Sequence, residues 1–266
     1  MSSPLRFEIE DRVAILTLDR PERGNSIDPR MLKALEQAWA RVEADPGIRV
    51  AIVTGAGERH FCTGADVSGL EQGVGGLNNR QYRDENRFSP RMMHVTKPVI
   101  CAVNGLVNGA GLHFVADSDV SISRDDVDYM DTHVSVGQVS ALESIGVARR
   151  AGPGAALLMG LAGRGYRMPA TRAYELGLVD LLEPSATAVM ARARELAQAM
   201  VRNSPQAMAL TKRAIWNSVE NVEPQATLYA WELLKSHWSH PDFEEGPKAF
   251  AEKRPANWNL DPNARR

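Results

Sequence analysis

Short apolar runs alternate with helical periodicity in the N-terminal half of the chain. Residues 13–18, 48–53 and 98–103 are rich in β-branched side chains, and glycine closes the last two runs. Such runs are typical of strands buried in a parallel sheet. Asp28 and Pro29 have the composition of a helix start, because the carboxylate can cap free N–H groups and proline suits the first turn. The pattern predicts an α/β arrangement.

The pattern changes at about Pro184, after which apolar positions recur at helical spacing. Ser204 and Pro205 begin another predicted helix, and a short last helix is expected from Asp242. The apolar stripes consist of Val189, Ala193, Leu196 and Met200, and of Leu228, Trp231, Leu234 and Trp238. We therefore predict an α/β core over residues 1–183 and a helical C-terminal region over residues 184–266.

Composition excludes several classes of protein. The chain has 266 residues, 44% hydrophobic and 24% charged, which is ordinary for a globular protein. With 31 Lys and Arg against 33 Asp and Glu, it has no basic field for nucleic acids or anionic membranes. Two cysteines, no leader-like N-terminus and no membrane-spanning run favour a cytoplasmic protein.

Two glycine-containing turns are the sharpest chemical features. Residues 61–67 and 102–111 each follow a predicted strand and can begin a helix, where backbone N–H groups are free. If the turns faced each other, their N–H groups would form a two-donor oxyanion hole. On spacing alone, tight turns without a catalytic role are the alternative.

An ordered set of motifs resembles the crotonase superfamily, the enoyl-CoA hydratase/isomerase family. The motifs occupy residues 19–21, 25–27, 61–67, 97–105, 109–111, 173–179 and 245–254. The resemblance implies a spiral core of ββα units and a helical C-terminal region that forms trimers. A homotrimer or a dimer of trimers is expected, with coenzyme A present only as part of the substrate.

The resemblance also assigns residues to an acyl-CoA site. The thioester carbonyl would accept hydrogen bonds from the backbone N–H groups of Ala65 and Ala110. Phe250 and Lys253 match positions that cover the CoA of a neighbouring subunit. The remaining positions that match the family's CoA-lining segments are Arg23, Gly24, Gly64, Ala65 itself, Asp66 and Val67.

The sequence departs from the family at both acid/base positions. Where the family's hydratases have two glutamates, this chain has His113 and His133. Imidazole titrates near pH 6.5 and can serve as base or acid, although His113 also fits a buried helix face. Asp131 and Glu143 are the carboxylates nearest to His133 in sequence that could reach the site, although a surface role is favoured for each.

The leading hypothesis is an enzyme that stabilises the enolate of an acyl-CoA thioester. Hydration, dehydration or double-bond isomerisation of an enoyl-CoA is favoured. C–C or thioester hydrolysis and non-catalytic acyl-CoA binding stay open, whereas RNA binding is disfavoured because no basic stripe exists. Cys62 is interpreted as a packed residue. His237 and His240 lack a third ligand, so we predict that they are solvated and that the chain has no metal site.

Overall fold

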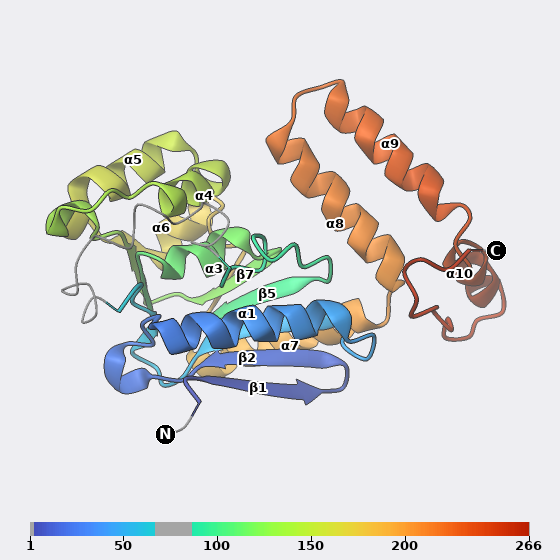
Figure 1. Cartoon of the computed structure of the whole chain (residues 1–266), viewed down its shortest axis with the longest axis horizontal. Coiled ribbons are helices and arrows are strands. Elements are labelled where there is room, and N and C mark those ends of the chain that lie inside the picture. The colour runs from blue at the N-terminus through green and yellow to red at the C-terminus, as the bar shows by residue number, and fades with distance from the viewer. Residues whose placement is uncertain (1–2, 67–86, 266) are drawn as a thin grey trace.

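Six strands form the larger sheet of the computed structural model, which describes residues 3–66 and 87–265 (Figure 1). Their order is β1-β2-β3-β5-β7-β10, with β1 antiparallel to β2 and every other neighbouring pair parallel. The strands are β1 (Leu5–Glu10), β2 (Val13–Leu18), β3 (Val50–Gly55), β5 (Val99–Val103), β7 (Val120–Arg124) and β10 (Leu181–Glu183).

A smaller sheet has the order β4-β6-β8-β9. Its strands are β4 (His60–Cys62), β6 (Leu106–Asn108), β8 (Asp128–Met130) and β9 (Met168–Pro169). The chain passes repeatedly from the larger sheet to the smaller one, from β3 to β4, from β5 to β6 and from β7 to β8. This alternation is the spiral of ββα units that the resemblance predicts.

Alternate side chains of the large sheet enter two different cores. On β2, Leu16 and Leu18 face the core that also contains Trp39 of α1 (Pro29–Ala44). Ile15 on the same strand faces the core closed by α7 (Ala186–Val201). Because both faces of the sheet are covered, its inner strands β2, β3 and β5 are apolar at nearly every position. The predicted strands and the helix start at Asp28, whose carboxylate accepts the N–H of Met31, are confirmed.

The remaining helices lie around these sheets. They are α3 (Gly111–Asp117), α4 (Leu142–Ala151), α5 (Pro153–Ala162), α6 (Ala170–Glu175), α8 (Pro205–Glu220), α9 (Gln225–His237) and α10 (Asp242–Ala251), with 3-10 turns at Pro21–Arg23, Val134–Val136 and Gly163–Gly165. The pair α8 and α9 projects away from the sheets (Figure 1). The boundary at residue 183 stays a prediction, although α7 packs on the large sheet and only the later helices project.

Two buried asparagines hold the ends of the strands that lead into the glycine-containing turns. Asn104 accepts the N–H of Gly55 and donates to its carbonyl, while Asn25 donates to the carbonyls of Ala56 and His60. A side chain at Gly55 would lie 2.6 Å from the carbonyl oxygen of Phe61, so this close approach requires glycine. These contacts fix where β4 and its following turn lie.

Candidate active site

The two turns predicted to form an oxyanion hole lie against each other. A Cβ atom added to Gly64, whose φ is +94°, would be 3.2 Å from the backbone nitrogen of Ala110. Gly109, with φ of +53°, brings the chain from β6 to Ala110, the N-cap of α3. The local backbone therefore explains why glycine occupies positions 64 and 109, because positive φ and close backbone approach each disfavour a side chain.

The backbone around Ala65 is pinned on both sides. Ile27 donates to the carbonyl of Gly64 at 2.8 Å, and Asp66 donates to the carbonyl of Ile27 at 2.9 Å. Within the described residues, neither the N–H of Ala65 nor that of Ala110 has a backbone acceptor. Two unpaired donors on adjoining turns, one at a helix start, can stabilise negative charge on an oxygen.

His133 lies beside the same turns and is held by a buried carboxylate. Its Nδ1 is 2.7 Å from Oδ1 of Asp131, which also accepts its backbone N–H at 3.0 Å. A Cβ atom on Gly109 would be 3.4 Å from Cε1 of His133. The imidazole is therefore adjacent to the turn that carries Ala110.

Hydrogen bonding and burial have opposite effects on the pKa of each member of the Asp131–His133 pair. The hydrogen bond to Asp131 raises the pKa of His133 above its usual 6.5, more than burial lowers it. Burial raises the pKa of Asp131, but hydrogen bonds from His133 and Ser140 outweigh this and leave the pKa below its usual value. A carboxylate that fixes one imidazole nitrogen leaves the other available for proton transfer.

His113 and Glu143 complete a cluster of titratable side chains. His113 is buried on α3, with Nδ1 3.4 Å from Oδ2 of Asp117 and Nε2 3.7 Å from Oε1 of Glu143. The same Glu143 oxygen is 4.0 Å from Nε2 of His133. The expectation that Asp131 and Glu143 lie at the surface is wrong, because Asp131 is buried and the Glu143 side chain is only 14% exposed.

No sequence pattern predicts that Glu143 lies beside the two histidines. After His133 the chain forms the 3-10 turn Val134–Val136, and α4 then begins at Leu142. This path places Glu143, in the first turn of α4, beside the two histidines. Nine residues of mostly irregular chain separate Glu143 from His133, so no helical or strand periodicity relates the two.

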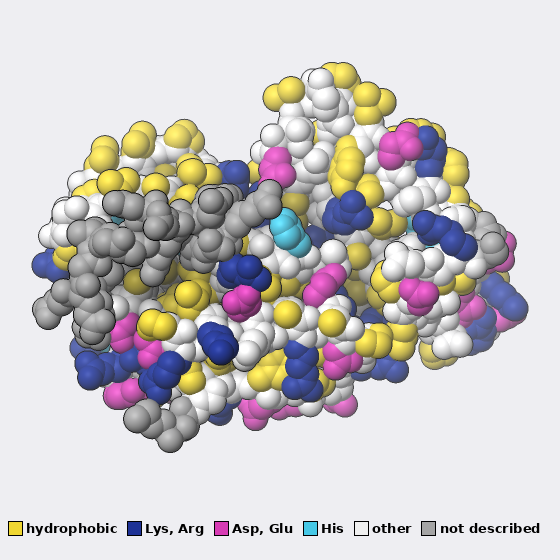
Figure 2. Space-filling view, viewed as in Figure 1, with side chains coloured by type: hydrophobic (Ala, Val, Ile, Leu, Met, Phe, Trp, Pro, Cys, Tyr) yellow, Lys and Arg dark blue, Asp and Glu magenta, His cyan; other side chains and the backbone are white. Residues whose placement is uncertain are grey.

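A cavity of about 1010 Å³ lies next to His113. Its lining includes Asp117 from α3, Ile145 and Arg149 from α4, and Arg91. Figure 2 shows basic side chains and an exposed histidine in the hollow between the two raised parts of this face, whereas His113 itself is buried. A space of this size can receive the acyl portion of a ligand whose reacting end reaches His113.

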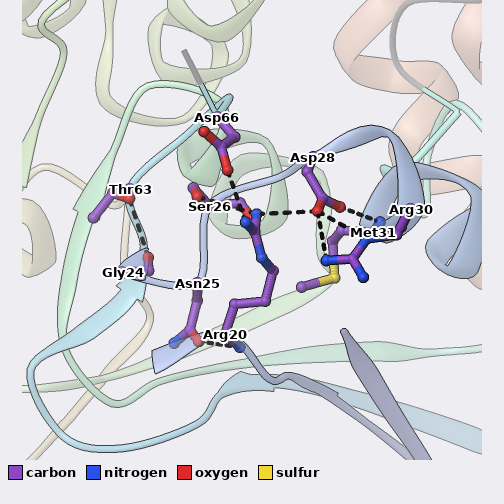
Figure 3. Close-up of polar contacts among 9 residues, drawn as sticks. All are labelled: Arg20, Gly24, Asn25, Ser26, Asp28, Arg30, Met31, Thr63 and Asp66. Carbon is purple, nitrogen blue, oxygen red and sulfur yellow. Dashed lines mark hydrogen bonds and ion pairs between the residues drawn. The ribbon is translucent and has the colours of Figure 1, made fainter. Parts of the chain in front are cut away.

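The predicted CoA-binding turn at Arg23 and Gly24 contacts the segment that leads to Ala65. Gly24 has φ of +63°, and its carbonyl accepts both the backbone N–H and the hydroxyl of Thr63. The carboxylate of Asp66 pairs with Arg20 at 2.8 Å (Figure 3). Arg20 and Thr63 were not among the predicted site residues, although both stand inside the motifs at residues 19–21 and 61–67.

The other predicted CoA contacts are not brought to this site within one chain. Phe250 is 88% exposed on α10, and Lys253 follows this helix. That helix lies at the opposite end of the molecule from α4 and α5 (Figure 1). Val67 lies outside the described residues.

Two further residues considered from the sequence, Cys62 and His240, are buried away from solvent. Burial raises the pKa of the Cys62 thiol to about 12, which confirms a packed residue rather than a nucleophile. The expectation that His237 and His240 are solvated is wrong for His240, which is fully buried with Nε2 3.0 Å from the carbonyl oxygen of Asp261. No group of three metal-ligating side chains occurs within the described residues.

Known proteins similar to this chain have the same fold. The family model for enoyl-CoA hydratase/isomerase matches residues 8–261. The (E)-benzylidenesuccinyl-CoA hydratase of Thauera aromatica is 35% identical over 94% of this chain and 97% of its own length. The short-chain-enoyl-CoA hydratase of Clostridium acetobutylicum is 29% identical, with 93% and 94% covered.

Solved structures agree with this assignment. An enoyl-CoA hydratase/isomerase from Mycobacterium paratuberculosis superposes with a TM-score of 0.87 at 33% identity, covering 97% of this chain and 98% of that one. The chain belongs to the enoyl-CoA hydratase/isomerase family of the crotonase superfamily, and it is an enzyme of the hydratase/isomerase type. Of the helices in the described residues, none is long and apolar enough to cross a membrane.

Proposed function

We propose that the enzyme hydrates an enoyl-CoA and catalyses the reverse dehydration, with His133 as general base. The observation that carries this proposal is the Asp131–His133 pair lying against Gly109, one residue before a proposed oxyanion donor. Neutral imidazole can take a proton from water as the water oxygen bonds to the β-carbon of the substrate. The Asp131 carboxylate stabilises the imidazolium that forms.

Water addition moves the double-bond electrons toward the thioester and creates an enolate. The N–H groups of Ala65 and Ala110 hold the carbonyl oxygen on which this negative charge develops. His113 in its imidazolium form then donates a proton to the α-carbon, and the carbonyl reforms. The product is a 3-hydroxyacyl-CoA, and coenzyme A is the only cofactor moiety that the reaction uses.

Double-bond isomerisation is the second candidate. It requires the same enolate and two proton-transferring groups, and the structure brings His113 and His133 to the same carboxylate, Glu143. In that reaction the base would remove a proton from the α-carbon of a 3-enoyl-CoA instead of from water, and a proton would be returned to the γ-carbon. Turnover of a 3-enoyl-CoA to a 2-enoyl-CoA without oxygen incorporation would identify it.

Arg23, Gly24, Gly64 and Asp66 are proposed to form the CoA-binding wall, with Phe250 and Lys253 supplied by a neighbouring subunit. The region from α8 to α10 supports a trimer or a pair of trimers because it exposes large apolar side chains. They are Ile215, Val219, Leu228, Trp231, Leu234, Trp238, Phe243 and Phe250. Exposed apolar surface of this kind is typical of subunit contacts. Sedimentation is expected to show three or six chains, and a monomer at micromolar concentration would contradict the assembly.

The proposed base predicts a rising pH profile. His133 acts in its neutral form, and the pKa of this side chain lies above 6.5 because of Asp131. The kcat/KM should therefore fall as the pH drops through that raised pKa, which forms the acidic limb of the profile. Asp131→Asn should lower the maximum rate and move the midpoint of this limb to lower pH, because the stabilising carboxylate is lost. A profile that Asp131→Asn leaves unmoved would contradict this role of His133.

A further inference from the structure

One carboxylate oxygen lies between the two imidazoles of the site. Oε1 of Glu143 is 3.7 Å from Nε2 of His113 and 4.0 Å from Nε2 of His133. The other nitrogen of each ring faces a carboxylate of its own, Asp117 for His113 and Asp131 for His133. Both rings therefore turn their remaining nitrogen toward Glu143.

The two imidazoles differ in their access to water. The side chain of His133 is 26% exposed, whereas that of His113 is 5% exposed. The His113 ring packs edge-on against Phe88, with 5.5 Å between ring centroids. Its Nε2 is buried and has no hydrogen-bond partner within the described residues. A proton that leaves His113 is therefore replaced slowly by bulk solvent.

Glu143 is suited to carry that proton. It lies in the first turn of α4, where the helix dipole favours a negative charge, and it is the carboxylate that Nε2 of His113 faces. Small side-chain rotations suffice to convert contacts of 3.7 and 4.0 Å into hydrogen bonds. The same oxygen can then accept a proton from one ring and donate it to the other.

We propose that Glu143 is a proton-relay residue that resets the site after each turnover. This inference rests on the proposed hydration, which leaves His133 protonated and His113 neutral. The imidazolium Nε2–H of His133 gives its proton to Oε1 of Glu143, and Glu143 passes that proton to Nε2 of His113. The relay restores both starting states, so the net reaction is the addition of one water molecule to the enoyl-CoA.

The relay predicts a kinetic signature for Glu143→Gln. The amide cannot accept and pass on a proton, yet it leaves both imidazoles in place for one reaction. A rapid-mixing assay with crotonyl-CoA should show a burst of one product per site, followed by steady-state turnover lowered roughly 10²-fold. Wild type should show no burst. Formate or imidazole buffer should accelerate the slow phase of the variant by supplying small proton carriers.

Matched variants separate the possible outcomes. Glu175→Gln, on the exposed face of α6, should behave as wild type. Glu143→Asp, which keeps the carboxylate, should recover part of the steady-state rate. Unchanged kinetics in Glu143→Gln would overturn the relay while leaving hydration intact, and a folded variant that has lost the burst too would assign Glu143 to the first chemical step instead. Failure of wild type to hydrate any enoyl-CoA would refute the proposed function itself.

Discussion

Replacing His133 by glutamine is expected to lower kcat about 10²–10⁴-fold, with little change in acyl-CoA binding. Glutamine keeps a polar side chain against Gly109 but cannot accept a proton from water at neutral pH. It also removes the imidazole whose Nδ1 lies 2.7 Å from the Asp131 carboxylate. Steady-state kinetics on a 2-enoyl-CoA, with acyl-CoA affinity measured separately by calorimetry, would test this expectation.

The matched control for this variant is His60→Gln. His60 lies on β4, and within the described residues its side chain forms no hydrogen bond or ion pair with either site histidine or with Glu143. Its replacement should leave kcat within a few fold of wild type. Near-normal kcat in His133→Gln, with a normal thermal unfolding transition, would remove His133 from the mechanism.

Replacing Ala110 by proline should reduce kcat/KM roughly 10²–10³-fold, the effect of losing one oxyanion-hole donor. Proline removes the N–H, and Ala110 has φ of −56°, which the proline ring accepts. Substrate binding through the CoA portion should be less affected, because the CoA-binding wall belongs to other segments. The same steady-state assay, together with a binding measurement on a saturated acyl-CoA, separates the two effects.

Ala186→Pro is the control for this second substitution. Ala186 is the first residue of α7, so a proline there has no helical hydrogen bond to remove. It should keep full activity. A folded Ala110→Pro variant with wild-type kcat/KM would place the oxyanion elsewhere.

Local patterns predicted the parts of the fold that local chemistry determines. The buried run at β2 and the capped start of α1 at Asp28 followed directly from residue types. The meeting of Gly64 with Ala110 was predicted only as a possibility, because it depends on how the two sheets alternate along the chain. The composition of the strands shows that the strands before Gly64 and Ala110 are buried. It does not show that the two turns after those strands lie against each other.

Long-range contacts limited the prediction of the site. Glu143 was expected at the surface because no periodicity relates it to His113 or His133, and only the return of the chain into α4 brings the three together. Asp66 was predicted to line the CoA site, but the pairing of its carboxylate with Arg20 was not predicted. That contact spans 46 residues, so sequence spacing carried no sign of it.

The most direct test of the account is the product that wild type forms from crotonyl-CoA in water enriched in both ¹⁸O and deuterium. Hydration through an enolate predicts 3-hydroxybutyryl-CoA with one solvent oxygen on the β-carbon and one deuteron on the α-carbon. Mass spectrometry reports both labels in the same molecule. Free coenzyme A as the product, or no turnover of crotonyl-CoA and longer or branched 2-enoyl-CoAs, would contradict the proposal.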